Sequence, residues 1–386
     1  MSLSVGIVGL PNAGKSTLFN ALLKKQVAFA ANYPFATIEP NVGVVPVPDE
    51  RLERLADIVE KEDSGQARMT EEKRPPIVPA TVEFVDIAGL VKGASVGQGL
   101  GNKFLSHIRE VDLIVHITRY FEDPDVVHVA GEIDPNRDKG IIETELILAD
   151  LQTLNKQVEP RGVKDTEAQR KWELIETLKI ALDDGKLARD VIPDAEDRHI
   201  LSDLHLLTMK PVLHVANVSE EQVGGRVILG RSEATTPESK TMLDKTSMTR
   251  MGQDDVLPIS AKIEAELAEL SEEEQRAYLK DLGLEKSGLE RLIQKAYEML
   301  GLISFLTMGV KEVRAWTITK GTKAPQAAGV IHTDFEKKFI KAEIISYADL
   351  VALGSRKKAQ ELGKLRFEGK EYEMQDGDVV EFKIGA

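Results

Sequence analysis

The sequence contains no cysteine among its 386 residues, which excludes disulfide bonds and thiolate metal sites. None of its apolar runs approaches the ~20 residues that a membrane-spanning helix needs. The N-terminus lacks the basic region and cleavage site of a signal peptide. Together these absences predict a cytoplasmic protein with no membrane partner.

Positive charge is also scarce, since the formal net charge is −14. That balance argues against non-specific nucleic-acid binding by the whole surface, so DNA is not an expected partner, although a local basic patch remains compatible with it. A hydrophobic fraction of 42% and a charged fraction of 30% are typical of a globular chain. The length exceeds that of one ordinary domain.

One loop stands out, because Gly9–Thr17 matches the phosphate-binding pattern G-x-x-x-x-G-K-[ST]. An apolar strand over Leu3–Val8 precedes it and a helix over Thr17–Leu23 follows, which is the setting that the motif requires. A chance match in a glycine-bearing turn is the alternative, and this setting disfavours it. Backbone N–H groups of the loop, the helix N-terminus and a lysine surround phosphates in such sites. The predicted nucleotide-binding residues here are Asn12, Ala13, Gly14, Lys15, Ser16 and Thr17.

A second phosphate motif, D-x-x-G, occupies Asp86–Gly89 at the end of a strand over Thr81–Asp86. The Asp86 carboxylate is expected to hold Mg²⁺ through water, with the Ser16 hydroxyl as a direct ligand, and the Gly89 N–H to meet the γ-phosphate. Thr37 can complete the Mg²⁺ shell, although an ordinary loop threonine is the alternative. Four glycines between 93 and 101 predict a mobile switch loop.

Further short apolar runs alternate with helical patterns, which predicts a largely parallel sheet with ligands at the carboxyl ends of its strands. The expected strands are Asn41–Val47, Leu113–Thr118, Pro211–Ala216 and Val256–Ile259. Pro46 places the first of these at a sheet edge or bulge. We expect a helix over Asp49–Glu60 and a loop over Thr70–Pro79.

A helical stretch, roughly 123–210, interrupts this alternation. Its two apolar stripes are broken by the polar segment Glu159–Thr166, which predicts an antiparallel hairpin with a coiled-coil-like seam. We interpret the stripes as the hairpin's own core and assign any partner contact to its charged outer faces or tip. The stripes consist of Ile147, Leu151, Leu154 and Val158, and of Trp172, Ile175, Leu178 and Leu182.

The pattern changes again after a closing helix over Leu289–Leu300. Strands over Ala315–Ile318, Phe339–Ile345 and Val379–Lys383 predict a small mixed α/β domain. This end holds slightly more basic than acidic residues, so we place basic contacts here. The polar segment Glu220–Asp255 is harder to interpret, with a helix possible over Glu238–Ser247.

The base-reading position departs from that of guanine-specific proteins with this fold, which carry Asn-Lys-x-Asp after the corresponding strand. Here the stretch is Asn217-Val218-Ser219-Glu220. The lysine is absent and the acid is one methylene longer. The guanine reader is therefore lost, and backbone groups around Val218 are candidates to recognise adenine. The stretch Ser260–Lys262 resembles the last base-flanking loop.

The chain resembles the Obg-like ATPases of the YchF family over nearly its whole length. The resemblance is carried by the motifs above and by the stretches Asn32–Asn41, Asp86–Asn102, Val310–Trp316 and Ala327–Phe335. The resemblance implies an α/β fold with a P-loop G-type domain over 1–123 and 207–300. It also implies an inserted α-helical coiled-coil domain over 124–206 and a C-terminal α+β TGS domain over 301–386. It further implies preference for ATP over GTP, and association with the ribosome, either its large subunit or the whole particle, through rRNA contacts.

The catalytic group is less explicit. Leu90 stands where many related hydrolases carry a water-orienting glutamine, and its side chain cannot polarise water. The resemblance points instead to His116 as the water-positioning residue. A half-buried strand histidine bonded to backbone is the alternative, and His107, on an expected surface helix, is the weaker competitor.

Three functions remain open at this stage. The first is a slow, switch-like ATPase with Mg²⁺ as cofactor and the ribosome as partner. The second is an Obg-type GTPase, against which Asn217–Glu220 argues. The third is a non-hydrolysing, nucleotide-regulated module that binds RNA or the ribosome, which Leu90 keeps in contention.

Overall fold

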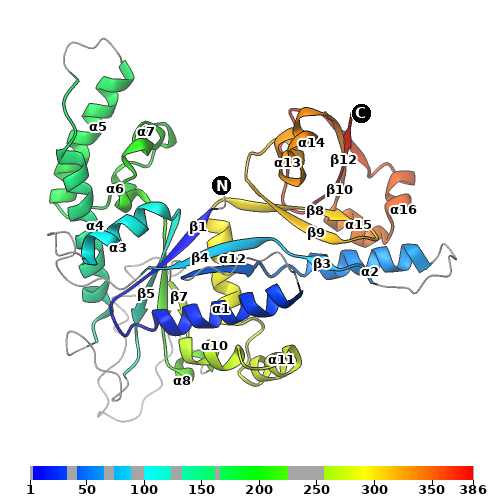
Figure 1. Ribbon diagram of the computed structural model, residues 1–386, viewed down its shortest axis with the longest axis horizontal. Coiled ribbons are helices and arrows are strands. Elements are labelled where there is room, and N and C mark those ends of the chain that lie inside the picture. The colour runs from blue at the N-terminus through cyan, green and yellow to red at the C-terminus, as the bar shows by residue number, and fades with distance from the viewer. Residues whose placement is uncertain are drawn as a thin grey trace, which may run out of the picture. The chain divides into compact units, whose positions relative to one another are not determined.

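The computed structural model describes residues 3–32, 41–64, 74–87, 100–122, 133–160, 166–224 and 256–385. The chain divides into two compact units (Figure 1). The first unit comprises Met1–Val45 and Glu83–Leu292, and the second comprises Pro46–Val82 and Ile293–Ala386. The predicted segments Glu238–Ser247 and 88–99 lie outside the described residues.

A six-stranded sheet with the order β2-β4-β1-β5-β6-β7 forms the centre of the first unit. The pairs β1–β4, β1–β5, β5–β6 and β6–β7 are parallel, as the sequence predicted. The strands are β1 (Ser4–Val8), β2 (Val42–Pro46), β4 (Thr81–Asp86), β5 (Leu113–Arg119), β6 (Val212–Asn217) and β7 (Val256–Ile259).

The burial of these strands explains why they could be predicted from apolar runs in the sequence. Every residue of β1 and β5 is buried, as expected for central strands that are covered on both faces. In β2, by contrast, buried and half-buried residues alternate. This strand lies at the edge of the sheet, as Pro46 indicated.

Helices of the first unit begin at identifiable caps. Asp134 caps α4, and Ser271 forms a reciprocal capping box with Glu274 at α11. The helices are α1 (Lys15–Asn32), α3 (Leu100–Glu110), α4 (Pro135–Asn155), α5 (Thr166–Asp183), α6 (Ala188–Val191), α7 (Ala195–Ile200), α8 (Glu220–Gly224), α10 (Ala261–Leu267) and α11 (Glu272–Asp281). Helix α12 (Gly288–Met299) begins in the first unit and ends in the second, because the division falls after Leu292. Short 3₁₀ turns cover Ser202–Leu204 and Leu207–Met209.

The predicted helical hairpin is present as α4 and α5, and its stripe is mainly its own core. Leu154, Leu174 and Leu178 lie in one buried cluster. The segment that follows α5 and leads back to β6, residues 184–211, adds Ile192 and Leu204 to this cluster. The prediction was wrong for Val158, which was expected in the apolar stripe of the hairpin. It follows the end of α4 at Asn155, and its side chain is 84% exposed.

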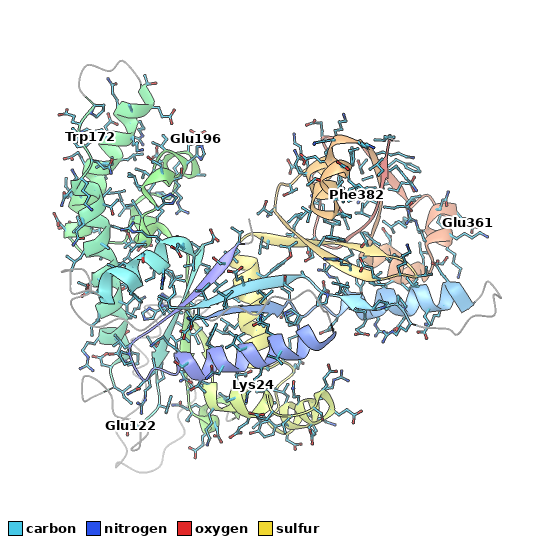
Figure 2. The ribbon with its side chains drawn as sticks, in the orientation of Figure 1. Lys24, Glu122, Trp172, Glu196, Glu361 and Phe382 are labelled. Atoms are coloured by element: carbon cyan, nitrogen blue, oxygen red, sulfur yellow. The ribbon has the colours of Figure 1, made fainter. Side chains whose placement is uncertain are left out.

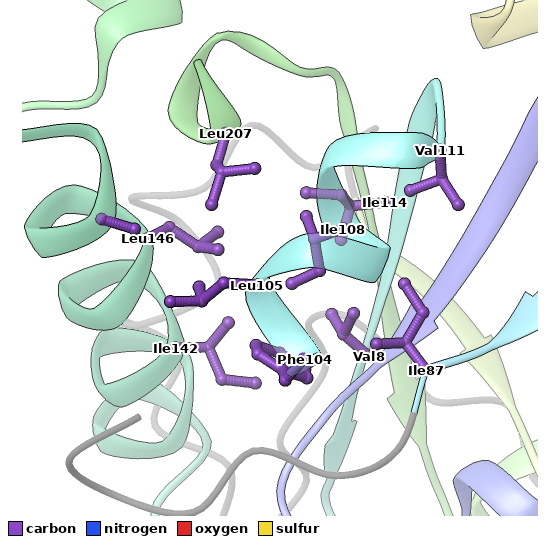
Figure 3. Packing of buried hydrophobic residues seen from close by; sticks show 11 residues of the cluster. Val8, Ile87, Phe104, Leu105, Ile108, Val111, Ile114, Ile142, Leu146 and Leu207 are labelled. Carbon is purple, nitrogen blue, oxygen red and sulfur yellow. The ribbon is translucent and has the colours of Figure 1, made fainter. Parts of the chain in front are cut away.

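The first half of α4 packs elsewhere. Its residues Ile142 and Leu146 face Leu105 and Ile108 of α3, in a cluster that reaches Val8 of β1 (Figure 3). The inserted helices are therefore fixed to the layer beside the sheet by apolar contacts, which helical periodicity alone did not reveal.

The second unit contains a six-stranded sheet with the order β11-β10-β12-β8-β9-β3. Its strands are β3 (Ile77–Val78), β8 (Leu302–Met308), β9 (Val313–Thr319), β10 (Phe339–Ser346), β11 (Arg366–Glu368) and β12 (Asp378–Ile384). Its helices are α2 (Arg51–Ser64), α13 (Ala324–Ile331), α14 (Thr333–Lys337), α15 (Tyr347–Leu353) and α16 (Arg356–Glu361). The sheet confirms the three predicted C-terminal strands and adds β8 and β11, which were not predicted from the sequence.

Two differences from the sequence analysis concern residues 46–82. Ile77 and Val78 were expected in a loop, but they form β3 and pair in parallel with Val313 and Arg314 of β9. Helix α2 belongs to the same unit. The predicted nucleotide-binding domain contained this whole segment, whereas the structure groups it with the C-terminal residues.

Candidate functional site

The loop Gly9–Thr17 joins β1 to α1, as its motif predicted. Asn12 has φ +64° and Gly14 has φ +97°, so the loop contains two left-handed residues. Alternation of right- and left-handed residues is how successive backbone N–H groups form a concave anion site. The Ala13 N–H donates to the Leu10 carbonyl at 3.3 Å, which closes the turn.

Lys15 lies at the N-terminus of α1 and is largely buried. Its Nζ donates to the Leu10 carbonyl at 2.8 Å, so the side chain folds back across the loop. Burial lowers the pKa of Lys15, while the nearby Asp86 carboxylate opposes that shift. The next two predicted residues, Ser16 and Thr17, are exposed in the first turn of α1, where backbone N–H groups favour anions.

Asp86 is the last residue of β4, half-buried, and its backbone N–H donates to the Asn41 carbonyl at 3.0 Å. Burial raises the pKa of Asp86, and Lys15 opposes the rise. The carboxylate has no hydrogen-bond partner within the described residues, and with the exposed Ser16 hydroxyl it supplies oxygen donors of the kind that Mg²⁺ takes. Thr37 and Gly89, also predicted here, lie outside the described residues.

Asn217, at the end of β6, connects two loops of the site. Its Nδ2 donates to the Ala13 carbonyl at 2.9 Å, and its Oδ1 accepts from the Ala261 N–H at 3.0 Å. The side chain is buried. Asn217 was predicted to be a nucleotide ligand, and here each end of its amide makes one hydrogen bond that holds the phosphate loop against the loop at Ser260–Ala261.

Val218 and Ser260 follow β6 and β7, so they lie at the same carboxyl edge of the sheet. The Val218 N–H donates to the Ile259 carbonyl at 2.9 Å, which uses that donor within the fold. Ser260 is buried, and its Oγ accepts from the Ile263 N–H at 3.5 Å as the N-cap of α10. Both residues therefore shape the base-side loops through backbone geometry.

Glu220 pairs with Lys262, the two side chains approaching to 2.5 Å between Oε1 and Nζ. Lys262 follows Ser260 and Ala261 in the base-flanking loop. The acid that stands in the place of the guanine-reading aspartate is thus directed at a lysine of the neighbouring loop. Both side chains are exposed, so the pair is weak and could be displaced.

His116 lies in the middle of β5 and its side chain is 2% exposed. Burial lowers the pKa of His116 to about 3, helped by the coulombic effect of His214 and by the positive charges of Lys139, Arg189 and Lys15. The ring is therefore neutral at physiological pH. Its Nε2 is buried and has no hydrogen-bond partner among the described residues, which disagrees with the alternative of a histidine bonded to backbone.

His214 is a neighbour that the sequence analysis missed. It is in register with His116 on β6, and the two ring centroids are 5.6 Å apart. Burial lowers its pKa to about 3 as well. The signal was available, because both histidines lie in the middle of apolar strands that were predicted to be in the same sheet.

The described site residues, His116 apart, gather where β1, β4, β6 and β7 end, which is where ligands bind in open parallel sheets. This fold and this loop define the class of P-loop nucleotide-binding proteins. Within the described residues, no helix is both long enough and apolar enough to cross a bilayer.

Known proteins that are similar to this chain belong to the same class, and they identify a family within it. A family model described as 50S ribosome-binding GTPase matches residues 4–147, and one named for the C-terminal region of the YchF GTPases, described as a protein of unknown function (DUF933), matches residues 302–385. The chain is 47% identical to a protein of Bacillus subtilis strain 168 over 100% of both chains. It is 44% identical to one of Escherichia coli O157:H7 over 99% of both. Both relatives are named "Ribosome-binding ATPase YchF".

A solved structure extends the likeness to the fold. The chain matches the structure titled "Structure of the Schizosaccharomyces pombe YchF GTPase" with a TM-score of 0.81 and 39% identity, covering 99% of this chain and 98% of that one. The chain belongs to the YchF family, which confirms the resemblance seen in its motifs. The relatives' names differ in the nucleotide that they imply, ATP or GTP.

Proposed function

We propose that this protein binds and hydrolyses ATP in preference to GTP and acts as a nucleotide-dependent switch associated with the ribosome. The Gly9–Thr17 loop holds the phosphates, and Lys15 supplies positive charge to them. Ser16, Asp86 through water, and Thr37 would hold Mg²⁺, which when bound neutralises charge on the phosphates. The Gly89 N–H would contact the γ-phosphate.

The preference for ATP is supported above all by the sequence Asn217-Val218-Ser219-Glu220, which lacks the lysine and the aspartate of a guanine reader. The pairing of Glu220 with Lys262 agrees with that absence. A guanine reader must present its carboxylate to two base N–H groups, and this carboxylate is directed elsewhere. Because the Val218 N–H is bonded to Ile259, its carbonyl is the backbone group that would accept from the adenine amino group. The backbone groups at Val218 and Ser260, rather than a side-chain carboxylate, would then distinguish adenine from guanine.

Hydrolysis requires a group that orients water, and Leu90 cannot do so. We assign this task to His116, whose neutral ring and unpartnered Nε2 leave a nitrogen able to bond water once the switch residues close. The variant His116→Ala should lower kcat at least tenfold with little change in ATP affinity, and His116→Gln should retain part of the rate. Equal loss of affinity and kcat would assign His116 to the fold instead.

Calorimetric titration with non-hydrolysable Mg²⁺-ATP and Mg²⁺-GTP analogues tests the nucleotide preference. Lys15→Ala serves as the control that removes binding of both. Tighter ATP binding is expected, and the paired substitution Val218→Lys with Glu220→Asp should shift affinity toward GTP. Tighter GTP binding by the unaltered protein would instead identify an Obg-type GTPase.

Phosphate release distinguishes the enzyme from a non-hydrolysing module. The unaltered protein should release phosphate faster than Lys15→Ala, with ribosomes present or absent. Identical rates would support the module that only binds nucleotide. Association with ribosomes is tested by co-sedimentation across a salt series, in which binding through rRNA should weaken as salt rises.

A further inference from the structure

His116 and His214 lie in one row of residues that crosses the sheet of the first unit. Val8 of β1 is in register with His116 of β5, and His116 is in register with His214 of β6. In-register residues of neighbouring parallel strands point to the same face of a sheet. Val8 packs with Ile142 and Leu146 of α4. The two histidine rings therefore lie on the face of the sheet that α4 covers.

Four residues border His116 on this face. Two are its in-register neighbours, and the other two lie two positions before and after it on β5; they are Val8, His214, Ile114 and Thr118. Val8 and Ile114 offer only apolar surface. The Thr118 hydroxyl donates to a backbone carbonyl of β6 at 3.4 Å. His214 is thus the bordering residue that sets a ring against the ring of His116.

The two rings are close enough to pack against each other. Their centroids are 5.6 Å apart and their planes are inclined at 50°, a separation at which aromatic rings attract. The terminal torsion of a histidine side chain is soft. The Nε2 of His116 has no hydrogen-bond partner among the described residues. Packing rather than hydrogen bonding therefore sets the plane of that ring.

Both rings are uncharged at physiological pH, which allows this packing. Burial lowers the pKa of His214 to about 3, as it does that of His116, and Lys139 and Arg189 of the inserted helices add to both shifts. These two cations share one carboxylate, since Glu143 lies 3.7 Å from Lys139 and 3.8 Å from Arg189. Two neutral rings can lie side by side, whereas two imidazolium ions would repel each other.

We propose that His214 is a positioning residue for His116, and that its ring holds the His116 imidazole in one plane so that Nε2 meets the attacking water at a fixed angle. This inference rests on the role given to His116 in the proposed function. A small misplacement of a group that orients a reactant lowers the rate of the chemical step. In this role His214 touches neither water nor nucleotide, so its loss should act on kcat and leave nucleotide affinity unchanged.

Phosphate release by the full-length protein at saturating Mg²⁺-ATP tests the role. His214→Ala should lower kcat about tenfold with KM unchanged, because the His116 ring is then free to rotate. His214→Phe restores a flat ring without a nitrogen, so it should keep kcat within about threefold of the unaltered protein. If His214→Phe loses as much kcat as His214→Ala, the nitrogen of His214 is required and positioning by packing is wrong.

Val212→Ala is the matched control. Val212 lies two residues before His214 on the same face of β6, and it is in register with Ile114 rather than with His116. This variant should lose stability but retain kcat. A fall in kcat equal to that of His214→Ala would show that any gap on this face has the same effect, and it would contradict a specific role for His214. Binding of an ATP analogue confirms that each variant is folded.

A double-mutant cycle shows whether His214 acts through His116. The kcat of the double variant His116→Ala with His214→Ala should equal that of His116→Ala alone, since no ring then remains to be held. A further fall, by the factor seen in the unaltered background, would mean that His214 acts independently and would overturn the inference. If His116→Ala retains full kcat although Lys15→Ala loses it, the proposed role of His116 itself fails.

Nitrogen-15 NMR of protein labelled at histidine gives a readout apart from activity. The His116 ring signals, identified by their loss in His116→Ala, should shift or broaden in His214→Ala. The control His199→Gln removes an exposed histidine of α7, the helix on which Glu196 is labelled in Figure 2, and should leave the His116 signals in place. Unchanged His116 signals in His214→Ala would show that the apolar neighbours alone hold the ring, and the inference would be wrong.

Discussion

The side-chain amide of Asn217 is hydrogen-bonded to the Ala13 carbonyl at 2.9 Å, across 204 residues of sequence. With its other end on the Ala261 N–H, it holds the phosphate loop and the base-side loop in one arrangement. Nucleotide affinity should therefore depend on Asn217 even without direct contact to the ligand, since the two halves of the site must be placed correctly relative to each other.

Substitution of Asn217 tests this connection. Asn217→Ala should lower nucleotide affinity about tenfold and the free energy of unfolding by about 1–3 kcal/mol, because two buried backbone groups lose their partners. Asn217→Asp retains the acceptor for Ala261 but places an oxygen against the Ala13 carbonyl, so it should also weaken binding. Calorimetry and urea unfolding measure both effects. Unchanged affinity in both variants would contradict the connecting role.

Gly14 should not tolerate a side chain. Its φ of +97° disfavours other residues, and an added Cβ would lie 2.2 Å from the Asn217 Nδ2. Gly14→Ala should therefore abolish measurable binding of the ATP analogue. Gly185→Ala is a matched control, because Gly185 also has positive φ (+78°) but nothing lies within 4 Å of an added Cβ. It should cost about 1 kcal/mol of stability and leave nucleotide affinity unchanged.

His116 should make stability depend on pH in a defined window. Its pKa is lowered to about 3 in the fold from the ordinary histidine value of 6.5, so between these pH values the unfolded chain binds a proton that the fold excludes. The free energy of unfolding therefore falls as pH falls through that window, by at most about 1.4 kcal/mol per pH unit from this group. Above pH 6.5 the contribution is constant.

Urea unfolding at pH 7, 6 and 5 measures that slope. His116→Leu should reduce the slope, whereas the exposed His199→Gln should leave it unchanged. A variant His116→Leu with the slope of the unaltered protein would show that other groups carry the pH dependence.

Asp150 should be the main polar anchor of the inserted helices. This fully buried carboxylate on α4 accepts from the Leu207 N–H, and from both the N–H and the hydroxyl of Thr208. Burial raises the pKa of Asp150, and those hydrogen bonds oppose the rise. Asp150→Ala should cost about 3 kcal/mol or more, because three buried donors lose their acceptor.

Hydrogen exchange at residues 207 and 208, with urea unfolding, measures this loss. Asp203→Ala is the control, since its pair with Lys171 is exposed and should contribute less than about 1 kcal/mol. Unchanged exchange in Asp150→Ala would show that apolar packing alone holds the returning segment.

Much of this protein could be predicted from local sequence. The phosphate loop was readable because its glycines, lysine and flanking apolar runs must lie at fixed spacing to surround a phosphate. The parallel strands were readable because burial on both faces requires continuous apolar residues, as in β1 and β5. The hairpin core followed from helical periodicity, apart from Val158 just past its end.

Other features were decided by tertiary structure. They depend on contacts between residues that are far apart in the sequence, and no local sequence pattern indicates such contacts. Ile77 and Val78 are too short a run to identify as a strand, and only pairing with β9 makes them one. The second role of Asn217 depends on where its amide meets Ala13 and Ala261. The side chains that share one face of the C-terminal sheet are set by the pairing of β10 with β11 and β12, which no single strand specifies. Sequence spacing determined the chemistry at the phosphates, and long-range packing decided which side chains share a face.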